Sequence, residues 1–344
     1  MHIRITKLNY LLLIIVADIN PFKRTPVRVS PKSDKLVSTW LFKNPTLIAN
    51  LKIMIKYNPK SWASLIFDVY SRYVFKSLLP LISFVGIFSA AYVAIVVDIA
   101  QLQYESTIQF HSIIGVMLGL FLVFRINTAY DRWWEGRKLW GKLVNDTRNL
   151  AIKINNILPI DKTDERNYFC KMIANIPFAT KEHLRDSTLT SELSLPDESL
   201  KKDVIASTHR PNKLANELFK KTNSLYKKKV IDGYQFFLVD KELKGFLDMI
   251  GGCERIKTTP IPFSFSMFCK KFLFIYTLTL PISLTMQFGY WTVPIVMLVF
   301  YFLVSIELIS EEIEDPFGED INDLPLDEIC FKIKKNIDEI IETK

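Results

Sequence analysis

Four stretches of the chain are apolar enough to cross a lipid bilayer, and they restrict the fold more than any other feature. They cover residues 77–97, 108–124, 272–289 and 291–306. A helix needs roughly 20 mostly apolar residues to span the hydrocarbon core, with a range of about 17–25. The last two stretches are short, and the turn between them has room only for a tight hairpin. The sequence therefore predicts an all-α, multi-pass membrane helical bundle with four spans.

A charged, tryptophan-rich segment follows the second predicted span directly. Residues 108–124 are almost wholly apolar, apart from His111, whereas the next residues include Arg132, Trp133, Trp134 and Glu135. Tryptophan is enriched at membrane borders because its ring is apolar while its N–H needs a polar partner. We therefore expect the second helix to enter water just after Phe124.

Positive charge lies on one side of the predicted spans. Lys and Arg cluster before the first span, after the second and before the third, whereas the linker at 98–107 contains Asp98 and Glu105 but no Lys or Arg. Basic flanks stay in the cytoplasm. The sequence thus predicts a cell-membrane protein with both termini cytoplasmic and the acidic linker outside.

This placement of Lys and Arg accounts for the net charge of +8. Because no nucleic-acid-binding motif accompanies the charge, no nucleic-acid partner is predicted.

The domain organisation follows from how the chain distributes its residues. It is 49% hydrophobic and 23% charged, and no Pro/Gly/Ser-rich linker separates these two characters. Residues 54–344 are predicted to form one domain, with cytosolic helices within 125–270 and 307–344. Residues 1–53 are interpreted as an N-terminal extension of uncertain origin, because the apolar run at 10–16 is too short to span a membrane. We expect that translation can begin at Met54.

The predicted cytosolic part shows helical rather than alternating spacing of its apolar residues. Helices are expected at 164–179, 199–206, 212–228, 234–250 and 326–341, with Gly251–Gly252 ending the fourth of them. The polar stretch 183–196 is predicted to be a loop. No strand pattern persists long enough to indicate a sheet.

Metal and catalytic motifs are absent from the sequence. The cysteines are scattered without a C-x-x-C pair on the predicted cytoplasmic side, where thiols stay reduced: Cys170, Cys253, Cys269 and Cys330. The four histidines lie far from these cysteines, so no zinc site, other metal or cofactor is predicted. Acid–base chemistry is conceivable only at Glu182–His183 or at His209 beside Arg210. The chain is therefore predicted not to be an enzyme.

Bulky and small residues form two neighbouring stripes along the second span. Val116, Leu120 and Phe124 recur every four residues, as do Gly115 and Gly119. Small residues let helices approach closely. A bulky apolar stripe repeated around an axis would make a constriction that closes by dewetting. From spacing alone, however, a lipid-facing or core position is the better interpretation.

The acidic segment at 311–327 directly follows the last predicted span. Its carboxylates, with a turn at Gly318, are able in principle to hold a hard divalent cation. The alternative is a helix exit and restart, with the acids facing solvent or pairing with basic helices. We favour this alternative, because the spacing matches no EF-hand loop.

Four blocks of the chain resemble the bestrophin family of ion channels, in particular its bacterial members. They lie at 124–151, 209–222, 251–263 and 314–327, and the resemblance extends over roughly 54–341. It depends most on YDRWWEGRKLWG after an apolar span combined with a distant DPFG block.

The resemblance implies an all-helical homopentamer around a single axial pore. It places a hydrophobic neck on Val116, Leu120 and Phe124, and a second, cytosolic restriction on Ile261 ahead of Pro262. Animal members bind calcium at an unbroken acidic run, which Ile321 and Asn322 interrupt here. Calcium gating is therefore not expected.

The predicted function is that of a channel for monovalent ions, with chloride or other anions first. Cation selectivity is the alternative, because Asp98 and Glu105 would form acidic rings at the outer mouth of a pentamer. A non-conducting membrane scaffold is the rival from another class. Besides permeant ions, the partners expected are further copies of the chain and membrane lipid.

Overall fold

The described part of the protein is entirely helical. The computed structural model describes residues 69–187 and 192–342, and the expectations for residues 1–53 lie outside them. Apolar residues dominate α5 (Val69–Ala94), the first third of α6 (Ile108–Ile157), α11 (Phe263–Phe288) and α12 (Thr292–Glu314). A π-helical turn at Ile95–Ile99 extends α5. Within the described residues, the prediction of an all-α fold is confirmed.

The remaining helices mix apolar and charged residues. They are α7 (Thr163–Leu184), α8 (Glu198–Ala206), α9 (Arg210–Lys227), α10 (Gly233–Thr258) and α13 (Leu326–Glu342). Each lies at or near a helix predicted from the sequence. In α13 one apolar face is buried, with Leu326, Ile333 and Ile337 almost completely covered.

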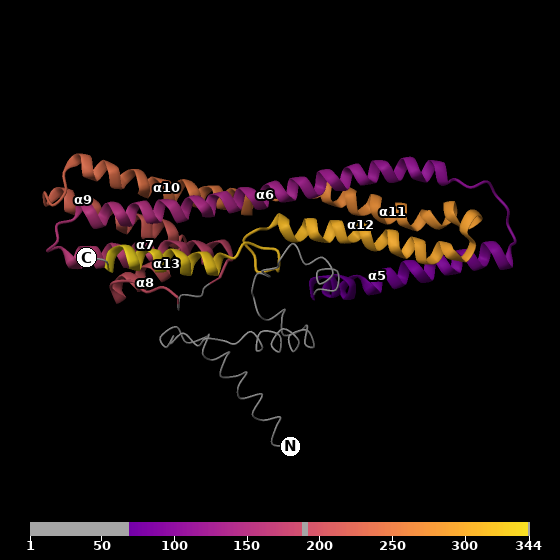
Figure 1. Cartoon of the computed structure of the whole chain (residues 1–344), viewed down its shortest axis with the longest axis horizontal. Helices are drawn as coiled ribbons and strands as arrows, with labels where there is room; N and C mark the ends of the chain where they lie inside the picture. Colours follow the sequence, from indigo (N-terminus) through magenta and orange to yellow (C-terminus); the bar gives the residue numbers. More distant parts are fainter. Residues whose placement is uncertain (1–68, 188–191, 343–344) are drawn as a thin grey trace, which may run out of the picture. The chain divides into compact units, whose positions relative to one another are not determined.

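Helix α6 is the common element of two packing groups. It contacts α11 and α12 in the first group, and α7, α10 and α13 in the second (Figure 1). Each group has its own hydrophobic core, to which α6 contributes Leu118 and Leu122 in the first and Trp140, Leu143 and Leu150 in the second. One continuous helix thus connects the predicted membrane part with the predicted aqueous part.

Among the described residues, three long helical stretches each contain a window with the length and hydropathy expected of a membrane span. They are Val74–Ile99, Ile108–Ile157 and Phe263–Glu314. The third stretch contains both α11 and α12, joined by a short 3-10 turn at Gly289–Trp291. Gly289 has a φ of 52°, a conformation that glycine adopts without a steric penalty. This turn matches the predicted tight hairpin.

Two expectations about the ends of α7 and α10 were wrong. Helix α10 runs through Gly251–Gly252 to Thr258, and the predicted loop begins later, because His183 belongs to the last turn of α7. At Gly252 a Cβ atom would lie 2.9 Å from a methyl carbon of Leu139, whereas at Gly251 it would meet nothing within 4 Å. The second glycine therefore serves the close packing of α10 on α6 and does not end the helix.

Alanine at these adjacent positions should separate packing from helix propensity. Gly251→Ala is expected to be neutral or stabilising, because alanine favours a helix interior by about 0.5–1 kcal/mol. Gly252→Ala should be less stable than Gly251→Ala by about 0.5–1.5 kcal/mol, because Leu139 must leave its rotamer. Thermal unfolding of both purified variants measures the difference. Equal stabilities would contradict the packing role of Gly252.

A buried arginine of α6 pairs with the end of α12, which in turn binds the segment that follows α10. Arg125 of α6 is 1% exposed, and its Nη2 lies 2.7 Å from Oε2 of Glu314 at the end of α12. Its Nε lies 3.6 Å from Glu307, whose carboxylate oxygens are buried without a hydrogen bond. The other Glu314 oxygen accepts the backbone N–H of Ile261 at 2.8 Å. Arg132, two turns further along α6, donates to the carbonyls of Ile256 and Thr259.

Removing this arginine should be strongly destabilising. Arg125→Met leaves the buried Glu307 without its counter-charge, a loss that costs about 3–5 kcal/mol for buried pairs. The control is Lys270→Met, which breaks the exposed Lys270–Glu311 pair and should cost less than about 1 kcal/mol. Adding Glu307→Leu to Arg125→Met should recover part of the stability. Similar unfolding temperatures for Arg125→Met and Lys270→Met would refute this account.

Candidate ion pathway

The predicted neck residues lie on the face of α6 that its own chain leaves uncovered. Val116, Leu120 and Phe124 are 75%, 56% and 54% exposed. Leu118 and Leu122 of the same helix are buried in the core with α11 and α12. The stripe is therefore not part of the core of a single chain. An exposed apolar face of this kind faces lipid, another copy or a pore.

Of the two glycines in the neighbouring small-residue stripe, only one lies in a close helix contact. At Gly115 a Cβ atom would lie 2.8 Å from the Tyr276 hydroxyl of α11, whereas at Gly119 it would meet nothing within 4 Å. Gly115 thus permits the close approach of α6 and α11. Nearby, His111 is buried, and its ring nitrogens hydrogen-bond to the hydroxyls of Thr279 and Ser283.

The two acidic residues predicted at the outer mouth are exposed. Asp98 lies in the π-helical turn and accepts a hydrogen bond from the Tyr290 hydroxyl in the α11–α12 turn. Glu105 lies in the linker to α6. That linker is held against α11, because the Tyr104 hydroxyl donates to the carbonyl of Ile282 at 2.6 Å and the Ser106 hydroxyl donates to that of Ser283 at 2.8 Å.

Ile261, the predicted cytosolic restriction, is covered within the chain. Its exposed fraction is 7%, in contrast to the open neck stripe. It lies between α10 and α11, where its own N–H donates to Glu314 and Arg132 donates to the carbonyl of Thr259. To line a conduit its side chain would have to rotate out of this position.

Several carboxylates of the acidic segment at 311–327 pair with basic side chains. Asp327 lies 2.7 Å from Lys181 and 3.0 Å from Arg185, both of α7. Its backbone also serves the tryptophan-rich border, because the indole N–H of Trp133 donates to the carbonyl of Asn322 at 2.9 Å. The segment thus joins α6 and α7 through charge and hydrogen bonds.

Comparison with known proteins settles the family. The family described as "Bacterial/Fungal Bestrophin protein" matches residues 54–339. The chain belongs to the bacterial and fungal bestrophin family. It is 40% identical over 231 residues to a voltage-dependent anion channel-forming protein of Nostoc sp., covering 66% of this chain and 75% of that protein. The voltage-dependent anion channel-forming protein YneE of Escherichia coli K12 is 31% identical over 250 residues, covering 72% of this chain and 81% of its own.

A solved structure supports the same assignment. The crystal structure of a bacterial bestrophin homolog from Klebsiella pneumoniae, phased by Zn-SAD, aligns with a TM-score of 0.72 and 26% identity. The alignment covers 76% of this chain and 98% of that one. The predicted resemblance is therefore confirmed, and the long apolar helices of this bestrophin are those of a membrane protein.

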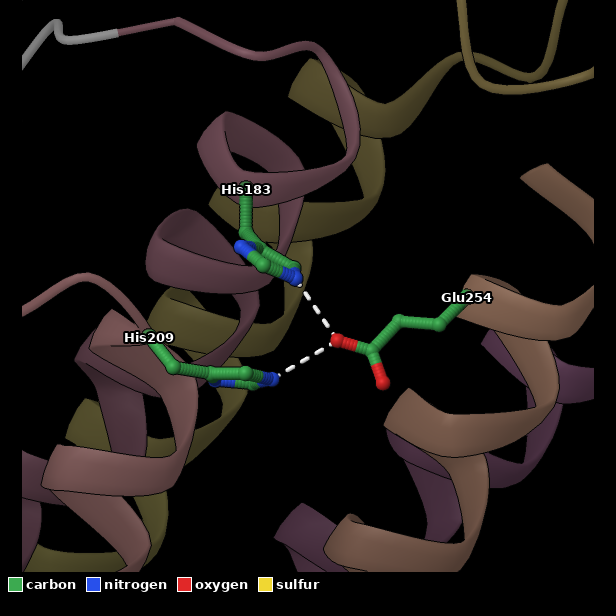
Figure 2. A group of neighbouring side chains, drawn as sticks. All are labelled: His183, His209 and Glu254. Atoms are coloured by element: carbon green, nitrogen blue, oxygen red, sulfur yellow. Dashed lines mark hydrogen bonds and ion pairs between the residues drawn. The ribbon is translucent and has the colours of Figure 1, made fainter. Parts of the chain in front are cut away.

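The fold also assembles a cluster that we did not predict. His183 at the end of α7, His209 at the start of α9 and Glu254 near the end of α10 converge on one point (Figure 2). One oxygen of Glu254, Oε1, lies 2.7 Å from Nε2 of each histidine. From the sequence alone, the two histidines are separate acid–base candidates. Their sequence separation from Glu254 hides the cluster.

A buried carboxyl in the acidic segment of this bestrophin has an unusual pKa. Burial raises the pKa of Asp323 to about 7, and the neighbouring carboxylates of Asp320, Asp315 and Glu312 act in the same direction. The N–H of Asp320 donates to its Oδ2 at 2.6 Å, while Oδ1 is buried without a hydrogen bond.

The pKa of Asp323 predicts the sign of one pH effect. Because the folded-state pKa lies above the ordinary value, the folded protein holds the proton more tightly. The contribution of Asp323 to stability is complete below pH about 4 and is lost as the pH rises to about 7, at no more than about 1.4 kcal/mol per pH unit. Asp323→Asn should therefore gain stability relative to the parent protein between pH 4 and 7. Thermal unfolding at several pH values tests this, and parallel curves would contradict it.

Proposed function

We propose that this bestrophin is the subunit of a pentameric channel in the cell membrane that passes monovalent anions, chloride first. The relatives named anion channel-forming proteins support the ion class, because they match most of their own length. The exposed apolar face of α6 at Val116, Leu120 and Phe124 is the observation that carries the proposal, because these side chains are not packed in the core of a single chain.

In this proposal Val116, Leu120 and Phe124 of all copies form the neck of the pore. A narrow apolar ring excludes water unless it widens, and ions then meet a barrier. The neck therefore acts as a gate by dewetting. Ile261 is proposed as a second, cytosolic restriction that forms only when its side chain rotates into the conduit.

The proposed topology has four spans, formed by α5, the start of α6, α11 and α12. Both termini and the helices α7–α10 and α13 lie in the cytoplasm, in accordance with the placement of Lys and Arg. Asp98 and Glu105 then lie at the outer mouth.

Cation conduction is the second candidate, and the exposure of these two carboxylates is the observation that favours it. Acidic rings attract cations. A non-conducting scaffold is the candidate of another class, because the basic cytosolic helices offer a docking surface.

Reversal potential decides the ion class. The purified protein is reconstituted into a planar bilayer under a KCl gradient, after its mass in detergent has been checked for five chains. A reversal potential near the chloride equilibrium value is expected. A value near that of potassium would replace the anion proposal by cation conduction through the acidic mouth.

Substitution in the neck tests the gate. Leu120→Ala is expected to raise single-channel conductance severalfold, because a wider and less apolar ring is wetted more often. Ile87→Ala is the matched control, since Ile87 is an apolar residue of α5 with 71% exposure and no role in the proposed neck. Equal conductance of the two variants would contradict the neck, and absence of current at every applied voltage from the parent protein would favour the scaffold.

A further inference from the structure

We propose that His183, His209 and Glu254 form a binding site for a first-row transition-metal ion, of which zinc suits the ligands best. The three residues come from three helices, α7, α9 and α10, and their ligand atoms all lie within 4.8 Å of one another (Figure 2). They are called the His–His–Glu cluster below.

The chemistry of the donor set selects the class of ion. Two imidazole nitrogens and one carboxylate oxygen are a recurrent zinc ligand set, in which water takes the fourth position. Calcium and magnesium bind through oxygen atoms and gain little from imidazole. The three side chains are 26%, 29% and 33% exposed, so an ion and a water molecule have access from solution.

The geometry of the cluster is compact enough for one ion. The shared oxygen lies 2.7 Å from both Nε2 atoms, and the two rings lie 4.3 Å apart at an angle of 32°. Zinc–ligand bonds of about 2.0–2.2 Å in a tetrahedron require ligand atoms roughly 3.3–3.5 Å apart. The ligands therefore need to separate by less than about 1 Å, and each is a partly exposed side chain at or near a helix end.

The carboxylate of Glu254 is available to an ion. Among the described residues, its side-chain partners are the two histidines, and no Lys or Arg pairs with it. The basic groups nearby have other partners, since Lys257 pairs with Asp186, Arg255 with Glu135, and Arg210 donates to the carbonyl of Ser187. A cation at the cluster thus replaces shared protons without displacing an ion pair.

Besides the two histidine–glutamate hydrogen bonds, binding exchanges one further hydrogen bond for the metal bonds. His209 Nδ1 accepts the N–H of Asn212 at 3.2 Å and so caps α9, which places the ring proton on Nε2. Coordination through Nε2 moves that proton to Nδ1 and releases the cap. The loss is confined to the exposed first turn of α9, whereas the metal joins the ends of three helices.

Zinc binding by the intact protein tests the proposal. The full-length protein, purified in detergent and stripped with EDTA, is titrated with Zn²⁺ against a chromophoric chelator. One ion per chain is expected. Glu254→Gln, which preserves the shape of the side chain, and the double variant His183→Gln/His209→Gln should each weaken binding at least tenfold. Glu135→Gln, which removes a nearby carboxylate outside the cluster, should leave the affinity unchanged.

The bound state is identified by X-ray absorption. A zinc site with nitrogen and oxygen neighbours only is expected, at about 2.0–2.2 Å. A sulfur neighbour at about 2.3 Å, or equal affinity in the parent and cluster variants, would overturn the proposal by placing the ion at cysteines or elsewhere. Melting temperatures without metal show that each variant is folded. Binding is measured without any current, so its outcome is independent of the proposed channel function.

Discussion

The buried ion pairing of Arg125 is the interaction on which the arrangement of the helices depends. A buried arginine side chain destabilises the fold unless carboxylates pair with its charge, and Glu307 and Glu314 of α12 pair with Arg125. Glu314 then holds the backbone at Ile261, while Arg132 holds the end of α10. Through these contacts the point where α6 leaves the apolar group is fixed to the point where the chain returns to it.

Much of the fold follows from local sequence properties. Hydropathy over about 20 residues indicates the spans, and the apolar spacing of Leu326, Ile333 and Ile337 indicates α13 because a helix repeats about every 3.6 residues. The tryptophans after Phe124 likewise predict a membrane border, although the sequence does not show that the N–H of Trp133 donates to a protein carbonyl. These features depend on neighbours along the chain, so they are readable without tertiary structure.

The features that sequence reasoning missed depend on distant contacts. In the sequence Gly252 indicates the end of a helix, whereas in the structure it allows Leu139 of α6 to pack closely against α10. The backbone position of Ile261 depends on a hydrogen bond to Glu314 of the distant α12. His183 and His209 are 71 and 45 residues from Glu254, so no spacing motif describes their cluster. The stripe at Val116, Leu120 and Phe124 has an ordinary helical periodicity. Its spacing alone does not indicate a neck, which only the family resemblance implies.

The unbroken course of α6 has a mechanical consequence. Its 50 residues at 1.5 Å rise extend about 75 Å, and the helix contributes to the cores of both packing groups. A rigid rod of this length acts as a lever, since a tilt of about 5° about one end displaces the other by roughly 6 Å. Movement of the apolar end of α6 is thus coupled to movement of its far end against α7, α10 and α13. Whatever stiffens the contacts of that far end also resists the tilt.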